Sequence, residues 1–259
     1  MKTRILTLAA LLAGCAGAHA AASVSSIAYM SLDGQEPWGQ SSNVDAMNAA
    51  FGAGRWDRIG FNDGWNGYAF VYVDGSESAG VAFQSFVDAN RGDLESYVAG
   101  GGRLFLNVAS NTSAGQTYTL VFGATTTEGQ YSEFGHATLP GSNPLVGNGS
   151  GTDWSGSWFA HNVVTPGGGF TTFITGDDGQ AIVAGISVGQ GTVLLGGQTT
   201  TGWHSGVNGS DPFQLRVNEL SFAATGTIAA AVPEPETYAL MLAGLGAIAM
   251  LARRRRQAD

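Results

Sequence analysis

Apolar residues cluster in short runs along the first half of the chain. Residues 25–32, 68–76 and 103–110 are almost continuously apolar, as is typical of strands buried on both faces. Between the last two runs, residues 78–102 have apolar positions at helical spacing and end in three glycines. Residues 68–110 therefore predict a strand, a long helix and a second strand, which together form a parallel crossover unit.

The remaining patterns predict two helices and three more strands. Residues 43–52 favour a short helix, with Asn43 as its N-cap and Gly52 as its end. A second helix is expected after Asp211, because Pro212 follows that acidic cap. The three strands, which Gly- and Asp-rich turns separate, are expected at 171–175, 180–189 and 191–198.

Three short motifs lie within this order of elements: Leu94–Leu106, Asn143–Val146 and Leu215–Leu220. The first has the form L..YV..GG.L at a joint between helix and strand. Together they resemble the glutamine amidotransferase-like branch of the flavodoxin-like α/β folds. The resemblance implies an α/β fold with a mostly parallel sheet flanked by helices. The alternative is a β-sandwich, which Gly- and Thr-rich sequence also suits.

The N-terminal residues 1–20 have the pattern of a secretory signal peptide. Lys2 and Arg4 precede an apolar stretch, and Ala18-His19-Ala20 is a cleavage site of the A-x-A type. The alternative is lipidation at Cys15, because Leu12-Ala13-Gly14-Cys15 resembles the lipobox of bacterial lipoproteins. Cys15 is the only cysteine, so cleavage after Ala20 leaves a mature chain without a thiol.

The C-terminal residues 232–259 combine a Pro-Glu-Pro triplet (Pro233, Glu234, Pro235), an apolar run at 238–252 and four arginines. As a helix the run reaches about 22 Å, whereas a hydrocarbon core is about 30 Å thick. The arginines Arg253, Arg254, Arg255 and Arg256 would stay cytoplasmic and orient the span. On these residues alone, a permanent C-terminal anchor is the alternative to a segment that is removed.

The order of triplet, short apolar helix and arginine cluster resembles the PEP-CTERM sorting signal of Gram-negative bacteria. That resemblance implies export through the Sec machinery, anchoring in the inner membrane by the C-terminal helix, and then processing by an exosortase. The processed protein would reach the cell surface or the extracellular exopolysaccharide of a biofilm. The expected organisation is a signal peptide at 1–20, an exported globular domain at 21–231 and the sorting signal at 232–259.

The charge of residues 21–231 narrows the range of partners. This body contains no lysine, and its five arginines and seventeen carboxylates give a formal charge of −12. Such a surface repels phosphate backbones, so nucleic-acid binding is not expected. It also repels anionic polysaccharide unless divalent cations bridge the two.

Sequence motifs of catalysis are missing from the body. The turn after the strand at 103–110 is Ser110-Asn111-Thr112, which has neither a cysteine nor the G-x-S-x-G elbow. His136, His161 and His204 are better explained as surface or core residues than as members of a triad. Residues 33–39 and 61–67 cluster oxygen ligands without EF-hand spacing, so we expect no metal and no cofactor.

Tryptophans supply the candidate ligand contacts. Trp154 and Trp158 lie four residues apart in a polar segment, and such rings can stack on sugars; packing in the core is the alternative. Asp74 and Asn111 follow the two buried strands, where the ligand cleft of an open α/β sheet is expected.

The sequence thus favours a non-catalytic exported protein that associates with extracellular polysaccharide. The alternative is a secreted carbohydrate-active enzyme that uses carboxylates such as Asp74, Glu133 or Asp153.

Overall fold

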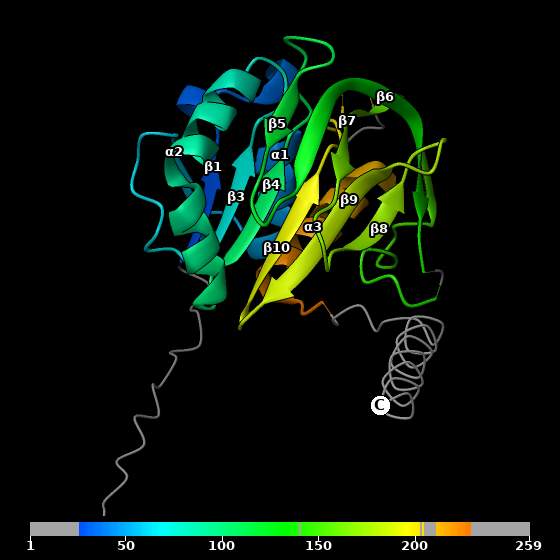
Figure 1. Ribbon diagram of the computed structural model, residues 1–259. Helices are drawn as coiled ribbons and strands as arrows, with labels where there is room; N and C mark the ends of the chain where they lie inside the picture. The colour runs from blue at the N-terminus through cyan, green and yellow to red at the C-terminus, as the bar shows by residue number, and fades with distance from the viewer. Residues whose placement is uncertain (1–25, 140, 203, 205–210, 229–259) are drawn as a thin grey trace, which may run out of the picture.

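The computed structural model describes residues 26–139, 141–202, 204 and 211–228, and these residues form one ten-stranded mixed sheet (Figure 1). The strand order is β2-β1-β3-β4-β10-β9-β7-β6-β5, and β8 pairs with both β6 and β9. The sheet has a parallel half and an antiparallel half, which meet where β10 pairs with β9.

The parallel half consists of β1 (Ile27–Met30), β2 (Asp57–Ile59), β3 (Phe70–Asp74), β4 (Arg103–Asn107) and β10 (Gly191–Gly196). All of β1, β3 and β10 is buried, as is all but the first residue of β4. The continuous apolar runs predicted β1, β3 and β4 because both faces of the sheet are covered here.

The antiparallel half consists of β5 (Thr117–Thr119), β6 (Thr125–Ala137), β7 (Asp153–Thr165), β8 (Thr171–Thr175) and β9 (Ala181–Val188). β6 and β7 form a long ribbon, shown at the upper right of Figure 1. Because β6 pairs with β7, β7 with β9, β9 with β8, and β8 with β6, the pairings close into a ring.

The predicted fold class is wrong. Among the described strands, four pairs are parallel and six are antiparallel, so the sheet is not the mostly parallel, flavodoxin-like sheet that was expected. The β-sandwich does not describe it either, because the strands join in one sheet. The error arises at β6 and β7, whose polar and glycine-containing sequences predict no strand.

Three helices pack on the sheet: α1 (Ser42–Phe51), α2 (Gly80–Ala99) and α3 (Asp211–Thr225). Helix α2 lies on one face of the parallel strands, and α1 and α3 lie on the other face (Figure 1). Buried side chains of α2 share a cluster with the first face, and those of α1 and α3 share a cluster with the second. Along β1, Ala28 and Met30 face α2, whereas Ile27 and Tyr29 face α1 and α3. This alternation follows from the two-residue period of a strand.

The predicted cap of α1 is wrong. Asn43 lies inside the helix, where it is 2% exposed, and Ser41 occupies the N-cap position. Gly52 does end the helix, with a φ of 94° that suits glycine.

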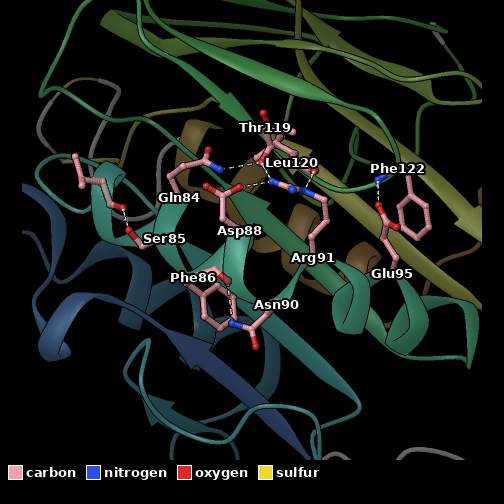
Figure 2. A network of polar contacts seen from close by, with 11 residues as sticks. Gln84, Ser85, Phe86, Asp88, Asn90, Arg91, Glu95, Thr119, Leu120 and Phe122 are labelled. Atoms are coloured by element: carbon pink, nitrogen blue, oxygen red, sulfur yellow. Dashed lines mark hydrogen bonds and ion pairs between the residues drawn. The ribbon is translucent and has the colours of Figure 1, made fainter.

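Polar side chains attach α2 to the last residue of β5 and to the segment that follows it (Figure 2). Arg91 donates to the carbonyl of Leu120 at 3.1 Å and pairs with Asp88, and Gln84 donates to the carbonyl of Thr119 at 3.2 Å. One turn further along, Glu95 accepts the backbone N–H of Phe122 at 2.7 Å. These contacts hold the start of the antiparallel half against α2.

The predicted signal peptide with Cys15 and the sorting segment 232–259 lie outside the described residues. Of the helices within the described ranges, none combines the length and the apolar character that a membrane crossing requires.

Candidate functional site

The carboxyl ends of β1 and β3 form the natural place for a site in this sheet. From β1 the chain passes through α1 to β2 on one side, and from β3 it passes through α2 to β4 on the other side. α1 and α2 lie on opposite faces, so β1 and β3 border a topological switch point. Ligands of open sheets that contain parallel strands bind in the crevice at such a point.

Asp74 at the end of β3 is the centre of a buried polar network at this edge. Its carboxylate accepts hydrogen bonds from Ser76 Oγ at 2.6 Å, from Asn43 Nδ2 at 3.0 Å and from Tyr29 OH at 3.4 Å. Burial raises the pKa of Asp74, and the hydrogen bonds from Ser76 oppose that shift. Asp74 is 1% exposed, so its carboxylate is enclosed by these hydrogen bonds and does not reach the surface of the crevice.

Glu36 closes the crevice over Asp74. Burial raises its pKa to about 7, although Arg58 Nη2, 2.5 Å from Glu36 Oε1, acts in the opposite direction. A cavity of about 10 Å³ lies between Glu36, Asp74 and Glu77. That volume suits about one water molecule, so the inner crevice is too small for an organic ligand.

A second set of buried charged residues lies between α3 and the strands β4 and β10. Arg216 of α3 pairs with Glu219 at 3.2 Å and donates to the carbonyl of Gln198 at 3.1 Å. Its guanidinium also lies over the rings of Tyr72 and Phe105. Because these charges are buried and paired, they serve the packing of α3 against the sheet.

The outer rim of the same edge carries an aromatic–histidine cluster, which consists of Trp38, Tyr131, Trp158, His161 and His204. The ring of Tyr131 packs against Trp158 with centroids 4.6 Å apart and meets His161 edge-on at 5.0 Å. Trp38 meets both histidines edge-on, at 5.3 and 5.2 Å. Strand β7, the middle of β6, the segment after β1 and the segment after β10 thus contribute rings to one cluster.

The histidines of this cluster are uncharged at neutral pH. Burial, together with the neighbouring His204, lowers the pKa of His161 to about 4. Burial also lowers the pKa of His204. The cluster therefore carries no charge at neutral pH, which suits an uncharged ligand.

Trp38 is held in the cluster by its backbone. Its φ is 52°, which is uncommon for a side chain of this size, and its N–H donates to Glu77 Oε2 at 2.6 Å. Glu77 also has a positive φ, of 54°. Trp38 and Glu77 thus both have a strained backbone, and a hydrogen bond joins them. Such strain often accompanies binding sites.

Asn162, which follows His161 on β7, exchanges hydrogen bonds of 3.3–3.4 Å with Ser110. Glu128 accepts hydrogen bonds from Tyr118 OH at 2.7 Å and from the N–H groups of Thr112 and Ser113. Burial opposes ionisation of Glu128, but these donors hold its pKa below the usual value. Ser110 is fully buried and is bonded to an amide, so the arrangement provides no serine nucleophile at the surface.

The structure separates the four residues that the sequence singled out. Trp158 is 39% exposed at the rim, whereas Trp154 is 2% exposed, donates to Ser150 Oγ and stacks on Phe159. Asn111 is exposed and Asp74 is buried. Only Trp158 belongs to the aromatic–histidine cluster.

Sequence reasoning missed the role of Tyr131. Its neighbours in β6 are polar, and its contact with Trp158 depends on the pairing of β6 with β7. A signal was present, because Tyr131 and Phe134 are large aromatic residues within a polar stretch that has no other large apolar side chain. Both are 42% exposed.

The carboxylates of the catalytic alternative do not share an environment. Asp74 is buried in its network, whereas Asp153 is on the surface and accepts a hydrogen bond of 2.8 Å from His136 Nδ1. Glu133 is exposed on β6. Within the described ranges, no group of three or more His, Cys, Asp or Glu is placed to hold a metal ion.

Residues 231–256 match the PEP-CTERM protein-sorting motif. The protein is therefore of the exported class that is sorted through its C-terminal region, and this region anchors it in the membrane before processing. Processing by an exosortase follows from the same motif. No curated protein matches the chain.

Several solved structures are similar to part of this chain. A β-galactosidase from Bacillus circulans sp. alkalophilus is 13% identical, with a TM-score of 0.44 over 79% of this chain and 32% of its own. A cytoplasmic protein from Salmonella typhimurium is 12% identical, with a TM-score of 0.47 over 76% and 98%. A glutamine amidotransferase from Thermotoga maritima is 10% identical, with a TM-score of 0.41 over 67% and 74%.

The chain spans about a third of the length of that β-galactosidase. At such identities, and with TM-scores below 0.5, these similarities assign neither a family nor an activity to the body.

Proposed function

We propose that the exported body is a non-catalytic protein that binds extracellular polysaccharide at the aromatic–histidine cluster. The observation that carries the proposal is the pair of exposed rings, Tyr131 and Trp158, with centroids 4.6 Å apart at the rim of the switch-point edge. Exposed aromatic side chains that are held in place by packing are a usual way to bind the apolar faces of sugar rings.

The surroundings of the two rings support binding rather than catalysis. His161 and His204 are kept neutral by burial, and the buried carboxylate of Asp74 is enclosed by its own hydrogen bonds. A glycosidase of the usual kind needs two accessible carboxylates at a fixed separation across one cleft. The surface carboxylate Asp153 is instead paired with His136.

A glycan array probed with the purified body tests this proposal. We expect Trp158→Ala and Tyr131→Ala each to weaken binding to the glycans that the wild type retains by about fivefold or more, since a lost aromatic contact costs about 1 kcal/mol or more. The matched control is Phe134→Ala, which removes an equally exposed ring from the same strand.

Equal losses for all three variants would indicate nonspecific adhesion of apolar side chains. Absence of binding to every glycan would remove the proposal. Release of reducing ends from a bound polysaccharide would replace it with the enzymatic alternative.

A further inference from the structure

An apolar groove lies under α3, on the opposite face of the sheet from α2. Its walls include Leu139, Pro144, Phe173, Phe222 and Ile228, and its volume is about 520 Å³. None of the described residues that line it is charged. We call it the C-terminal groove. Leu139 is 48% exposed at its rim with a φ of 55°, so an apolar side chain is held in water by a strained backbone.

The chain leaves the described fold from the wall of this groove. The carbonyl of Gly226 accepts hydrogen bonds from Arg103 and from Thr192 Oγ1, and the N–H of Ile228 donates to Ser187 Oγ at 2.9 Å. Ile228 is only 6% exposed. The exit point is therefore fixed beside the groove, and the residues that follow start next to an apolar surface that none of the described residues fills.

The next four residues have the composition that such a surface binds. Ala229, Ala230, Ala231 and Val232 are small, apolar and uncharged, and they lie outside the described residues. Four extended residues reach about 13 Å, and a groove of this size is in the usual range for a bound segment. We infer that residues 229–232 of the same chain bind in the C-terminal groove.

This contact has a consequence for sorting. Val232 directly precedes Pro233, so a docked segment holds the Pro-Glu-Pro triplet at the surface of the body and not on a free tether. Only residues 233–237 then separate the body from the apolar run, a span of at most about 18 Å. The exosortase would receive its recognition triplet at a fixed position relative to the folded domain.

Cross-linking in the full-length chain tests the contact. In a Cys15→Ser background, which has no other cysteine, Leu139→Cys is combined with Ala230→Cys. The control combines Ala230→Cys with Val81→Cys, because Val81 is 58% exposed on α2 at the other face of the sheet. We expect an intramolecular disulfide in the first pair under mild oxidation and at least tenfold less in the control.

Failure of the first pair to form the disulfide would overturn the inference, because Ala230, only two residues after the fixed Ile228, would then lie outside the groove. A disulfide between two chains would assign the groove to a second copy and also overturn it. Hydrogen exchange in the full chain gives a second measurement: the amides of 230–232 should be protected at least tenfold, and Leu139→Glu should abolish that protection. Exchange at the rate of unstructured peptide in the unsubstituted chain would contradict the inference.

Discussion

Glu36 shows how a single residue can depend on the topology of the sheet. It lies in the segment between β1 and α1, where folding brings it over the end of β3 and next to Asp74. Its side chain is 14% exposed, and its Oε2 has no hydrogen-bond partner among the described residues. Burial therefore outweighs the ion pair with Arg58, and the pKa is raised to about 7.

Because the folded pKa of Glu36 exceeds the unfolded value of 4.5, the folded state retains a proton between about pH 4.5 and 7 that the unfolded state has lost. Its contribution to stability is present below that window and is lost as pH rises through about 7. We predict that Glu36→Gln removes this pH-dependent loss in the free energy of unfolding, which is at most about 3 kcal/mol. Urea unfolding of wild type and variant at pH 4 and pH 8 measures it.

The comparison isolates Glu36, because Glu219, whose pKa burial also raises to about 7, is present in both proteins. The variant should gain stability relative to wild type as pH rises. A difference between the two proteins that is the same at both pH values would contradict the prediction.

At the scale of elements, the site depends on a close approach between β10 and β7. The carbonyl of Gly197, just after β10, accepts the N–H of His161, and a Cβ on Gly197 would lie 1.9 Å from the carbonyl oxygen of Asn162. Because Gly197 has no side chain, β7 can approach β10 closely, and the aromatic–histidine cluster lies at the end of the parallel half.

Gly197→Ala should therefore destabilise the fold by about 1–3 kcal/mol, as overpacking does elsewhere. The matched control is Gly168→Ala, since a Cβ at Gly168 meets nothing within 4 Å and its φ is not positive. Thermal unfolding followed by circular dichroism should show a lowered Tm for the first variant and an unchanged or slightly raised Tm for the second. Similar Tm values for both variants would show that β7 is free to move away.

The same elements explain which parts of the fold could be predicted. Strands β3 and β4 and helix α2 follow from the sequence because burial on both faces imposes a continuous apolar pattern. β6 does not, because it is half exposed and its register against β7 shifts between Glu128, Ser132 and Phe134. Each shift breaks the alternation of apolar and polar residues from which a strand is inferred.

The candidate site, like the fold, could be predicted only in part. Trp158 could be singled out because it is a large aromatic residue in a polar stretch of the sequence. Its partners Tyr131 and His161 could not, because their contact requires the shifted pairing of β6 with β7. Trp154 has the same local sequence character as Trp158 and is buried, since only three-dimensional packing distinguishes the two.

At the scale of the whole molecule, the body and its sorting segment differ in the sign of their charge. The body carries a formal charge of −12, and four of its five arginines are engaged with carboxylates or carbonyls: Arg58, Arg91, Arg103 and Arg216. The four arginines at 253–256 are concentrated beyond the apolar run. Removal of the segment would therefore remove the largest basic cluster and leave a strongly acidic protein.

We predict that replacing Pro233, Glu234 and Pro235 together by alanine blocks this removal, because the sorting motif loses the residues that distinguish it from an ordinary anchor. Intact mass spectrometry of the exported protein from cells that contain an exosortase should show a wild-type product without the arginine cluster. The triple variant should keep residues 253–256 and remain in the membrane fraction. Its body is unchanged, so binding to glycans serves as the control for folding. A wild-type product that retains residues 253–256 would show that the segment is a permanent anchor, and the acidic body would then act at the membrane surface. Loss of the arginine cluster from both proteins would show that the triplet is not needed for removal.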